Sequence, residues 1–202
     1  MAEMAMFPLE SVLLPGMPLG LQIFEPRYLQ LLDDVADAED GFGVVLITRG
    51  SEVGGQDQRA EFGTVAQIVQ KSDMGGGRWL VEALATDRFR VVSWRNDDPY
   101  PKADVELRPH TLEEGAADVV DLARERFGEF LALVDELGVD TSRLDLTADP
   151  IAAVYEMAAT VPISTYDRYQ ILAADNIGDA AATLAEAIIG SNEILRSRLG
   201  GP

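Results

Sequence analysis

The sequence of 202 residues has no cysteine, a single histidine and only two lysines. Without cysteine there can be no disulfide, no thiolate nucleophile and no Cys-ligated zinc. The lack of disulfides favours a location in the cytoplasm. One histidine also excludes an ordinary zinc site. Unbroken apolar runs, such as residues 44–47, fall far short of the roughly 20 residues that cross a bilayer. The first ten residues carry no basic side chain, so we expect no secretory signal and no membrane partner.

Positive charge is also scarce. The chain has 35 acidic and 16 basic side chains, a net charge of −19. Residues 1–110 carry 18 acidic and 10 basic side chains, a net of −8, and residues 111–202 carry 17 and 6, a net of −11. Nucleic-acid affinity rests largely on cationic contacts with phosphate, so we expect no nucleic-acid partner. The acidic surface either keeps the protein soluble or forms a docking face for a basic partner.

The residue patterns of common catalytic sites are missing. Neither Lys71 nor Lys102 follows a glycine, so no phosphate-binding loop of an ATPase is present. His110 has no serine in a Gly-x-Ser-x-Gly turn to act on. The acidic pairs at 33–34 and 97–98 lack the spacing of a calcium loop. We therefore expect no catalytic residue, no metal and no cofactor.

The hydrophobic pattern changes character near residue 110, which predicts two subdomains, 1–110 and 111–202. Short apolar stretches separated by turn residues predict strands in the first part. These strands are expected at residues 6–9, 19–24, 42–48, 62–69, 79–86, 89–94 and 103–107. Residues 44–47 are apolar on both faces, so this strand should be covered on both sides. Pro26 suits a first helical turn, and a helix is expected over residues 26–35.

Helical spacing dominates the second part. An apolar stripe from Val120 to Leu137 predicts a long helix that ends at Gly138. Asp149 before Pro150, and Ser164 with Asp167, have the pattern of helix N-termini. A last helix follows residue 176. Two stretches of the first part are expected to connect strands: a mobile loop at residues 50–58 and a flexible hairpin turn at residues 73–77.

Three N-terminal segments resemble the signature of the Lon protease N-terminal domain family. Residues 7–9 read FPL, residues 14–16 read LPG, and residues 19–28 run as LGLQIFEPRY, in the order and spacing of the family. Residues 63–68, 88–91 and 170–172 resemble later segments of the family. Gly20, Gln22 and Ala85 depart from its pattern. The resemblance therefore covers nearly the whole chain, which ends where a full Lon protease would continue into an ATPase and a peptidase.

This resemblance implies an α+β fold, with an N-terminal twisted β-barrel-like (PUA-like) sheet followed by a C-terminal helical bundle. It implies a non-catalytic module that binds unfolded or extended protein segments, as an adaptor or chaperone-like partner of a protease or chaperone. A PUA-like RNA-binding module and an orphan Lon-related hydrolase are the alternatives. The sequence leaves the oligomeric state open.

The candidate peptide-binding residues come from the strand-to-helix junction and from the later pair at residues 88–89, beside a groove between sheet and helices. They are Phe24, Glu25, Pro26, Arg27, Tyr28, Arg88 and Phe89. The pattern favours a purely structural role for the junction over binding, because such a turn needs a proline at the helix start and buried aromatic side chains. We also expect six of the apolar residues to form the N-terminal core. They are Leu21, Ile23, Phe24, Val45, Ile47 and Phe89.

Overall fold

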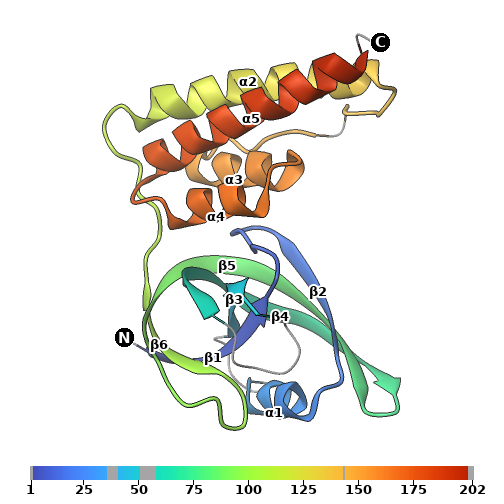
Figure 1. Ribbon diagram of the computed structural model, residues 1–202, viewed down its shortest axis with the longest axis vertical. Helices are drawn as coiled ribbons and strands as arrows, with labels where there is room; N and C mark the ends of the chain where they lie inside the picture. The colour runs from blue at the N-terminus through green and yellow to red at the C-terminus, as the bar shows by residue number, and fades with distance from the viewer. Residues whose placement is uncertain (1, 36–40, 51–57, 143, 200–202) are drawn as a thin grey trace. The chain divides into compact units, whose positions relative to one another are not determined.

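The computed structural model describes residues 2–35, 41–50, 58–142 and 144–199. The chain divides into two compact units, Met1–Pro109 and His110–Pro202, which we call the β unit and the helical unit. Each is drawn in Figure 1. Of the expected loop at residues 50–58, residues 51–57 lie outside the described part of the chain.

The β unit contains one mixed sheet in the order β2-β5-β4-β3-β1-β6 (Figure 1). Its strands are β1 (Ala2–Leu9), β2 (Pro18–Ile23), β3 (Phe42–Arg49), β4 (Gln58–Gly75), β5 (Arg78–Trp94) and β6 (Lys102–Leu107). β1 runs parallel to β3, and the other pairs are antiparallel. Because β6 pairs with both β1 and β5, the sheet curls into a barrel-like form. The predicted α+β fold is confirmed.

One predicted strand break is wrong. Residues 79–86 and 89–94 belong to a single strand, β5, which pairs with β4 over most of its length. Thr64 pairs with Arg88 but Ala66 pairs with Ala85, so two residues of β5 face one residue of β4. This β-bulge disturbs the alternation that the sequence analysis interpreted as a break. The hairpin turn is confirmed, because Gly75, Gly76 and Gly77 all have positive φ.

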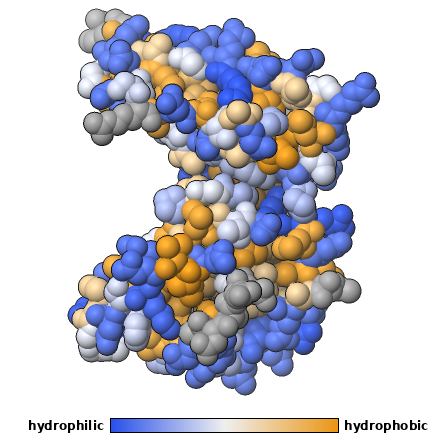
Figure 2. All heavy atoms as spheres, turned by 180° about the vertical axis from the view of Figure 1, so that it is seen from behind, coloured by the Kyte–Doolittle hydropathy of each residue, from blue (hydrophilic) through white to orange (hydrophobic). Residues whose placement is uncertain are grey.

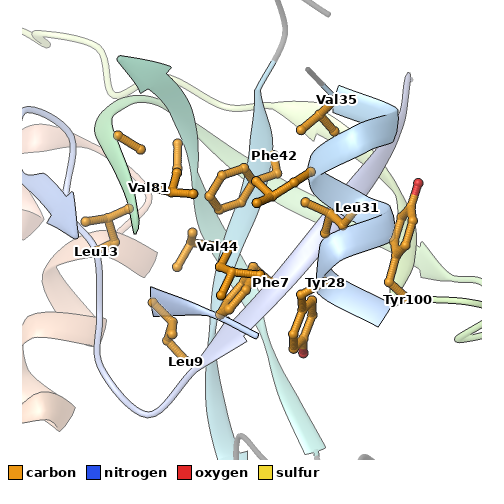
Figure 3. Close-up of a cluster of buried hydrophobic side chains, with 14 of the residues drawn as sticks. Phe7, Leu9, Leu13, Tyr28, Leu31, Val35, Phe42, Val44, Val81 and Tyr100 are labelled. Atoms are coloured by element: carbon orange, nitrogen blue, oxygen red, sulfur yellow. The ribbon is translucent and has the colours of Figure 1, made fainter. Parts of the chain in front are cut away.

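The sheet has a hydrophobic cluster on each side. The inner cluster comes from the strands of the barrel-like ring. It consists of Met6, Val45, Val65, Phe89, Val91, Ala103 and Val105. The outer cluster packs between the sheet and a helix, and Figure 3 labels ten of its residues. Val44 belongs to the outer cluster and Val45 to the inner one, so β3 is covered on both sides as predicted.

Helix α1 (Pro26–Val35) covers the outer cluster and matches its predicted bounds. Tyr28 stacks on Phe7 of β1 with ring centroids 4.2 Å apart, and Leu31 is fully buried (Figure 3). The predicted burial of Ile23 is confirmed, but that of Phe24 is wrong because its side chain is 58% exposed. β2 ends at Ile23, so Phe24 lies in the turn before α1 and leaves the register of the strand. Leu21 is only partly buried.

The helical unit contains α2 (Ala116–Glu136), α3 (Pro150–Thr160), α4 (Thr165–Ala173) and α5 (Ile177–Leu199). α2 and α5 pack along each other (Figure 1). The predicted caps are confirmed: Asp149 accepts a hydrogen bond from Ala152 N, and Ser164 accepts one from Asp167 N. No helix in the described residues is long and apolar enough to span a membrane.

Candidate functional site

The junction between β2 and α1 holds five of the seven candidate residues. Glu25 accepts a hydrogen bond from Arg27 at 3.0 Å, and the Arg27 guanidinium lies 4.4 Å from the centre of the Tyr28 ring. Pro26 starts the helix, and Tyr28 is buried in the outer cluster. Glu25, Arg27 and Tyr28 thus hold one another in place, whereas Phe24 presents its ring to the surface.

The other two candidates lie elsewhere in the β unit. Arg88 is buried, donates a 2.6 Å hydrogen bond to the carbonyl oxygen of Arg108 and lies over the Phe62 ring. Phe89 is fully buried in the inner cluster. A Cβ atom added at Gly63 would lie 2.6 Å from the Phe89 ring, so this glycine allows the ring and the strand to pack closely. The structure therefore does not bring these two residues together with Phe24.

Strand β2 offers an open edge. Among the described strands it pairs only with β5, which leaves its other edge without a strand partner. Backbone groups on such an edge can pair with an added strand. Phe24 follows the end of this strand, and Leu84, paired with Pro18 at the other end, is also exposed. In Figure 2 the β unit carries apolar patches among hydrophilic ones.

A second feature, which sequence analysis missed, is a cavity of about 710 Å³ at one end of the barrel-like ring. We call this cavity the barrel mouth. Its wall includes the start of β1, the β-bulge of β5 and the end of β6. Four carboxylate residues line it, namely Glu3, Asp34, Asp87 and Glu106. They come from four distant segments, so the sequence pattern carries no signal that they meet.

Tyr100 ties the barrel mouth to α1. Its hydroxyl donates a 2.6 Å hydrogen bond to Asp34, and Gln30 donates another at 2.8 Å. The hydrogen bond from Tyr100, and to a smaller extent the one from Gln30, holds the pKa of Asp34 below its ordinary value. Burial raises the pKa of the Tyr100 hydroxyl most, and its hydrogen bond to Asp34 raises it further. Asp34 is therefore an anion and Tyr100 a neutral donor at neutral pH.

The remaining chemistry-bearing residues have structural partners. His110 Nε2 lies 2.8 Å from the carbonyl oxygen of Ala174, and Nδ1 lies 2.6 Å from the Tyr155 hydroxyl. Lys71 lies over the Trp79 ring and Lys102 over the Tyr100 ring. In the part of the chain that the structure describes, no three His, Cys, Asp or Glu residues are arranged to hold a metal ion.

Comparison with known proteins identifies the architecture. The model of the ATP-dependent protease La (LON) substrate-binding domain matches residues 3–188. The chain belongs to this family. Lon protease 2 of Sorangium cellulosum is 29% identical to this Lon substrate-binding domain, over an alignment of 201 positions that covers 92% of this chain and 24% of that protein. A LON peptidase N-terminal domain and RING finger protein of Schizosaccharomyces pombe is 24% identical, over 82% of this chain and 40% of that protein.

Solved structures agree with this family assignment. The crystal structure of a Lon N-terminal domain protein from Xanthomonas campestris matches 94% of this chain and 98% of its own, with a TM-score of 0.64 and 25% identity. The N-terminal domain of Mycobacterium avium complex Lon protease has the same fold, with a TM-score of 0.68 and 16% identity. The chain spans less than half the length of the two curated relatives described above.

Proposed function

We propose that this Lon substrate-binding domain is a non-catalytic module that binds unfolded or extended protein segments. The observation that carries the proposal is the open edge of β2 with the exposed ring of Phe24 at its end. The family match supports it, since the matched model is a substrate-binding domain and not a peptidase or ATPase.

Two kinds of contact would hold the segment. The backbone of the segment pairs with the open edge of β2, and such backbone pairing tolerates many sequences. An apolar side chain of the segment packs on Phe24. Neither contact requires a folded partner. The net charge of −19 favours segments that mix basic and apolar residues. In this role the module delivers segments to a protease or a chaperone.

The test is a fluorescence titration of labelled unfolded peptides with the full chain. The Phe24→Ala variant should weaken binding by about five- to ten-fold, because it removes an exposed aromatic anchor. Val92→Ala is the matched control, since Val92 is 50% exposed on another strand of the same unit. Equal affinities for the wild-type and Phe24→Ala proteins would contradict the proposed site.

Two comparisons separate this function from its alternatives. A higher salt concentration should lower the affinity for basic peptides without abolishing it, because salt screens charges beyond about 8–10 Å while apolar contacts persist. A structured RNA should bind weakly, and tight RNA binding without peptide binding would favour the RNA-module alternative. Casein degradation by the purified chain, with or without ATP, would favour the hydrolase.

A further inference from the structure

We infer that the barrel mouth binds a basic side chain, lysine or arginine, of an extended polypeptide. The inference rests on the proposed function and names the residue class that this domain selects. The cavity lies wholly within the β unit. Its volume of about 710 Å³ falls in the range of pockets that hold small ligands, and barrel mouths are a common place for such pockets.

The strand directions explain why this cavity exists. β1 and β3 run in parallel, while β4, β5 and β6 alternate in direction around the ring. The starts of β1 and β3, the middle of β4, the bulge of β5 and the end of β6 therefore meet at one end of the ring. The inner cluster closes that end from below, because Val65 and Val105 belong both to the cluster and to the cavity wall.

The wall combines an apolar floor with a carboxylate rim. Met4, Val65 and Val105 give the floor, and Glu3, Asp34, Asp87 and Glu106 give the rim. No lysine or arginine is among the described residues that line the cavity. A lysine or arginine side chain has the complementary layout, because its methylene stem packs on apolar surface while its charged head stays among polar groups.

The rim carboxylates differ in how far they are compensated. Arg95 pairs with Glu3 at 3.0 Å, and Arg108 pairs with Glu106 at 3.0 Å. Asp34 accepts hydrogen bonds from Tyr100 and Gln30, and the positive charge of Lys102 also acts on it. Asp87 is exposed and forms no ion pair with a described residue. The β-bulge places Thr86 and Asp87 opposite Val65. Bulges at barrel rims re-aim side chains, so Asp87 is the carboxylate best placed to meet an incoming cation.

The spacing of the rim favours an organic cation over a metal ion. A calcium or magnesium ion needs several oxygen ligands at about 2.0–2.6 Å. Among the described residues no three carboxylate or histidine side chains converge in this way. Carboxylates around an apolar floor are better suited to an organic cation, whose apolar stem contacts the floor while its charged end contacts the rim.

The experiment compares two unfolded peptides that differ at one position, lysine or the uncharged norleucine. The wild-type chain should bind the lysine peptide about five-fold more tightly. Asp87→Asn should reduce that preference to less than about two-fold, since it removes the uncompensated charge. Glu82→Gln is the matched control, because Glu82 is exposed on β5 outside the cavity wall, and it should keep the preference.

Amide NMR spectra recorded during the same titrations locate the side chain. With the lysine peptide, shifts at Thr86, Asp87 and Val105 should exceed those with the norleucine peptide. Retained peptide binding without a lysine preference, or a preference that Asp87→Asn and Glu82→Gln reduce equally, overturns the barrel-mouth assignment alone. If neither peptide binds the wild-type chain, both the assignment and the proposed function are overturned.

Discussion

Both units bury large apolar side chains, but alanine makes up a larger share of the buried apolar residues in the described part of the helical unit, 7 of 19, than in that of the β unit, 5 of 26. The β unit buries large side chains in two clusters on either side of one sheet, with Phe42 and Phe89 both fully buried. The helical unit buries seven alanines along its helices. They are Ala116, Ala123, Ala153, Ala158, Ala180, Ala181 and Ala185. Small residues let helices approach closely, and the interior of a curled sheet is filled by its inward-facing side chains, of which Phe89 is the largest in the inner cluster.

This difference bears on where binding takes place. A ring of strands that is filled by a few large side chains leaves a cavity where the filling ends, and the barrel mouth lies at such an end. In the helical unit, both ring nitrogens of His110 form hydrogen bonds with groups of the same unit. Both surfaces proposed for binding, the open edge of β2 and the barrel mouth, belong to the β unit.

The strongest test of the comparison removes a large side chain from the inner cluster. Phe89→Ala should lower the free energy of unfolding of the β unit by about 3–5 kcal/mol, because it leaves a cavity between the strands. Urea unfolding followed by near-ultraviolet circular dichroism measures this loss. Val92→Ala, an exposed position on the same strand, should change it by less than about 0.5 kcal/mol. A small loss for Phe89→Ala would show that the inner cluster is not tightly packed.

The converse test enlarges a small side chain in the helical unit. Ala181→Leu should cost about 1–3 kcal/mol, because Ala181 is fully buried on α5 and the added atoms have no space. Its neighbour Ala182 is exposed, so Ala182→Leu is a control with the same chemical change. Thermal unfolding followed by far-ultraviolet circular dichroism distinguishes the two. Equal stability of both variants would contradict the view that this unit depends on close helix approach.

The smallest expected effect concerns the contact between α1 and the barrel mouth. Tyr100→Phe removes the hydrogen bond that contributes most to lowering the pKa of Asp34, so that pKa should rise toward its ordinary value. A lowered pKa in the folded state stabilises it above the unfolded pKa of about 3.9, and this stabilisation is lost as the pH falls. The stability difference between wild type and Tyr100→Phe should therefore be largest near neutral pH and shrink in acid.

Carboxyl NMR titration of Asp34 measures the pKa directly. Tyr166→Phe is the control, because Tyr166 is 70% exposed in the helical unit, and it should leave the titration of Asp34 unchanged. A stability difference that grows as the pH falls would have the wrong sign for this contact.

Local signals in the sequence predict most of the fold. The bounds of α1 follow from Pro26 and the helical spacing, and the starts of α3 and α4 follow from Asp149 and Ser164. Each of these signals depends on residues within one or two turns. The break predicted in β5 failed because a bulge and a strand end give similar local patterns. Only the pairing with β4 distinguishes them.

The candidate site is less predictable. The exposure of Phe24 depends on β2 ending one residue earlier than the hydrophobic pattern suggests. The barrel mouth depends on the closure of the ring, since Glu3 and Glu106 are more than a hundred positions apart in the sequence but line one cavity. Strand register and ring closure are long-range properties, and no local spacing encodes them.

The two-sided burial of β3 has a consequence for the dynamics of the β unit. Val44 and Val45 are joined by one peptide bond, yet one packs in the outer cluster and the other in the inner cluster. Opening either cluster requires β3 to move, and any movement of β3 also disrupts the other cluster. The β unit should therefore unfold as one cooperative body, and the amides of Val44 and Val45 should exchange with solvent only when the whole β unit unfolds.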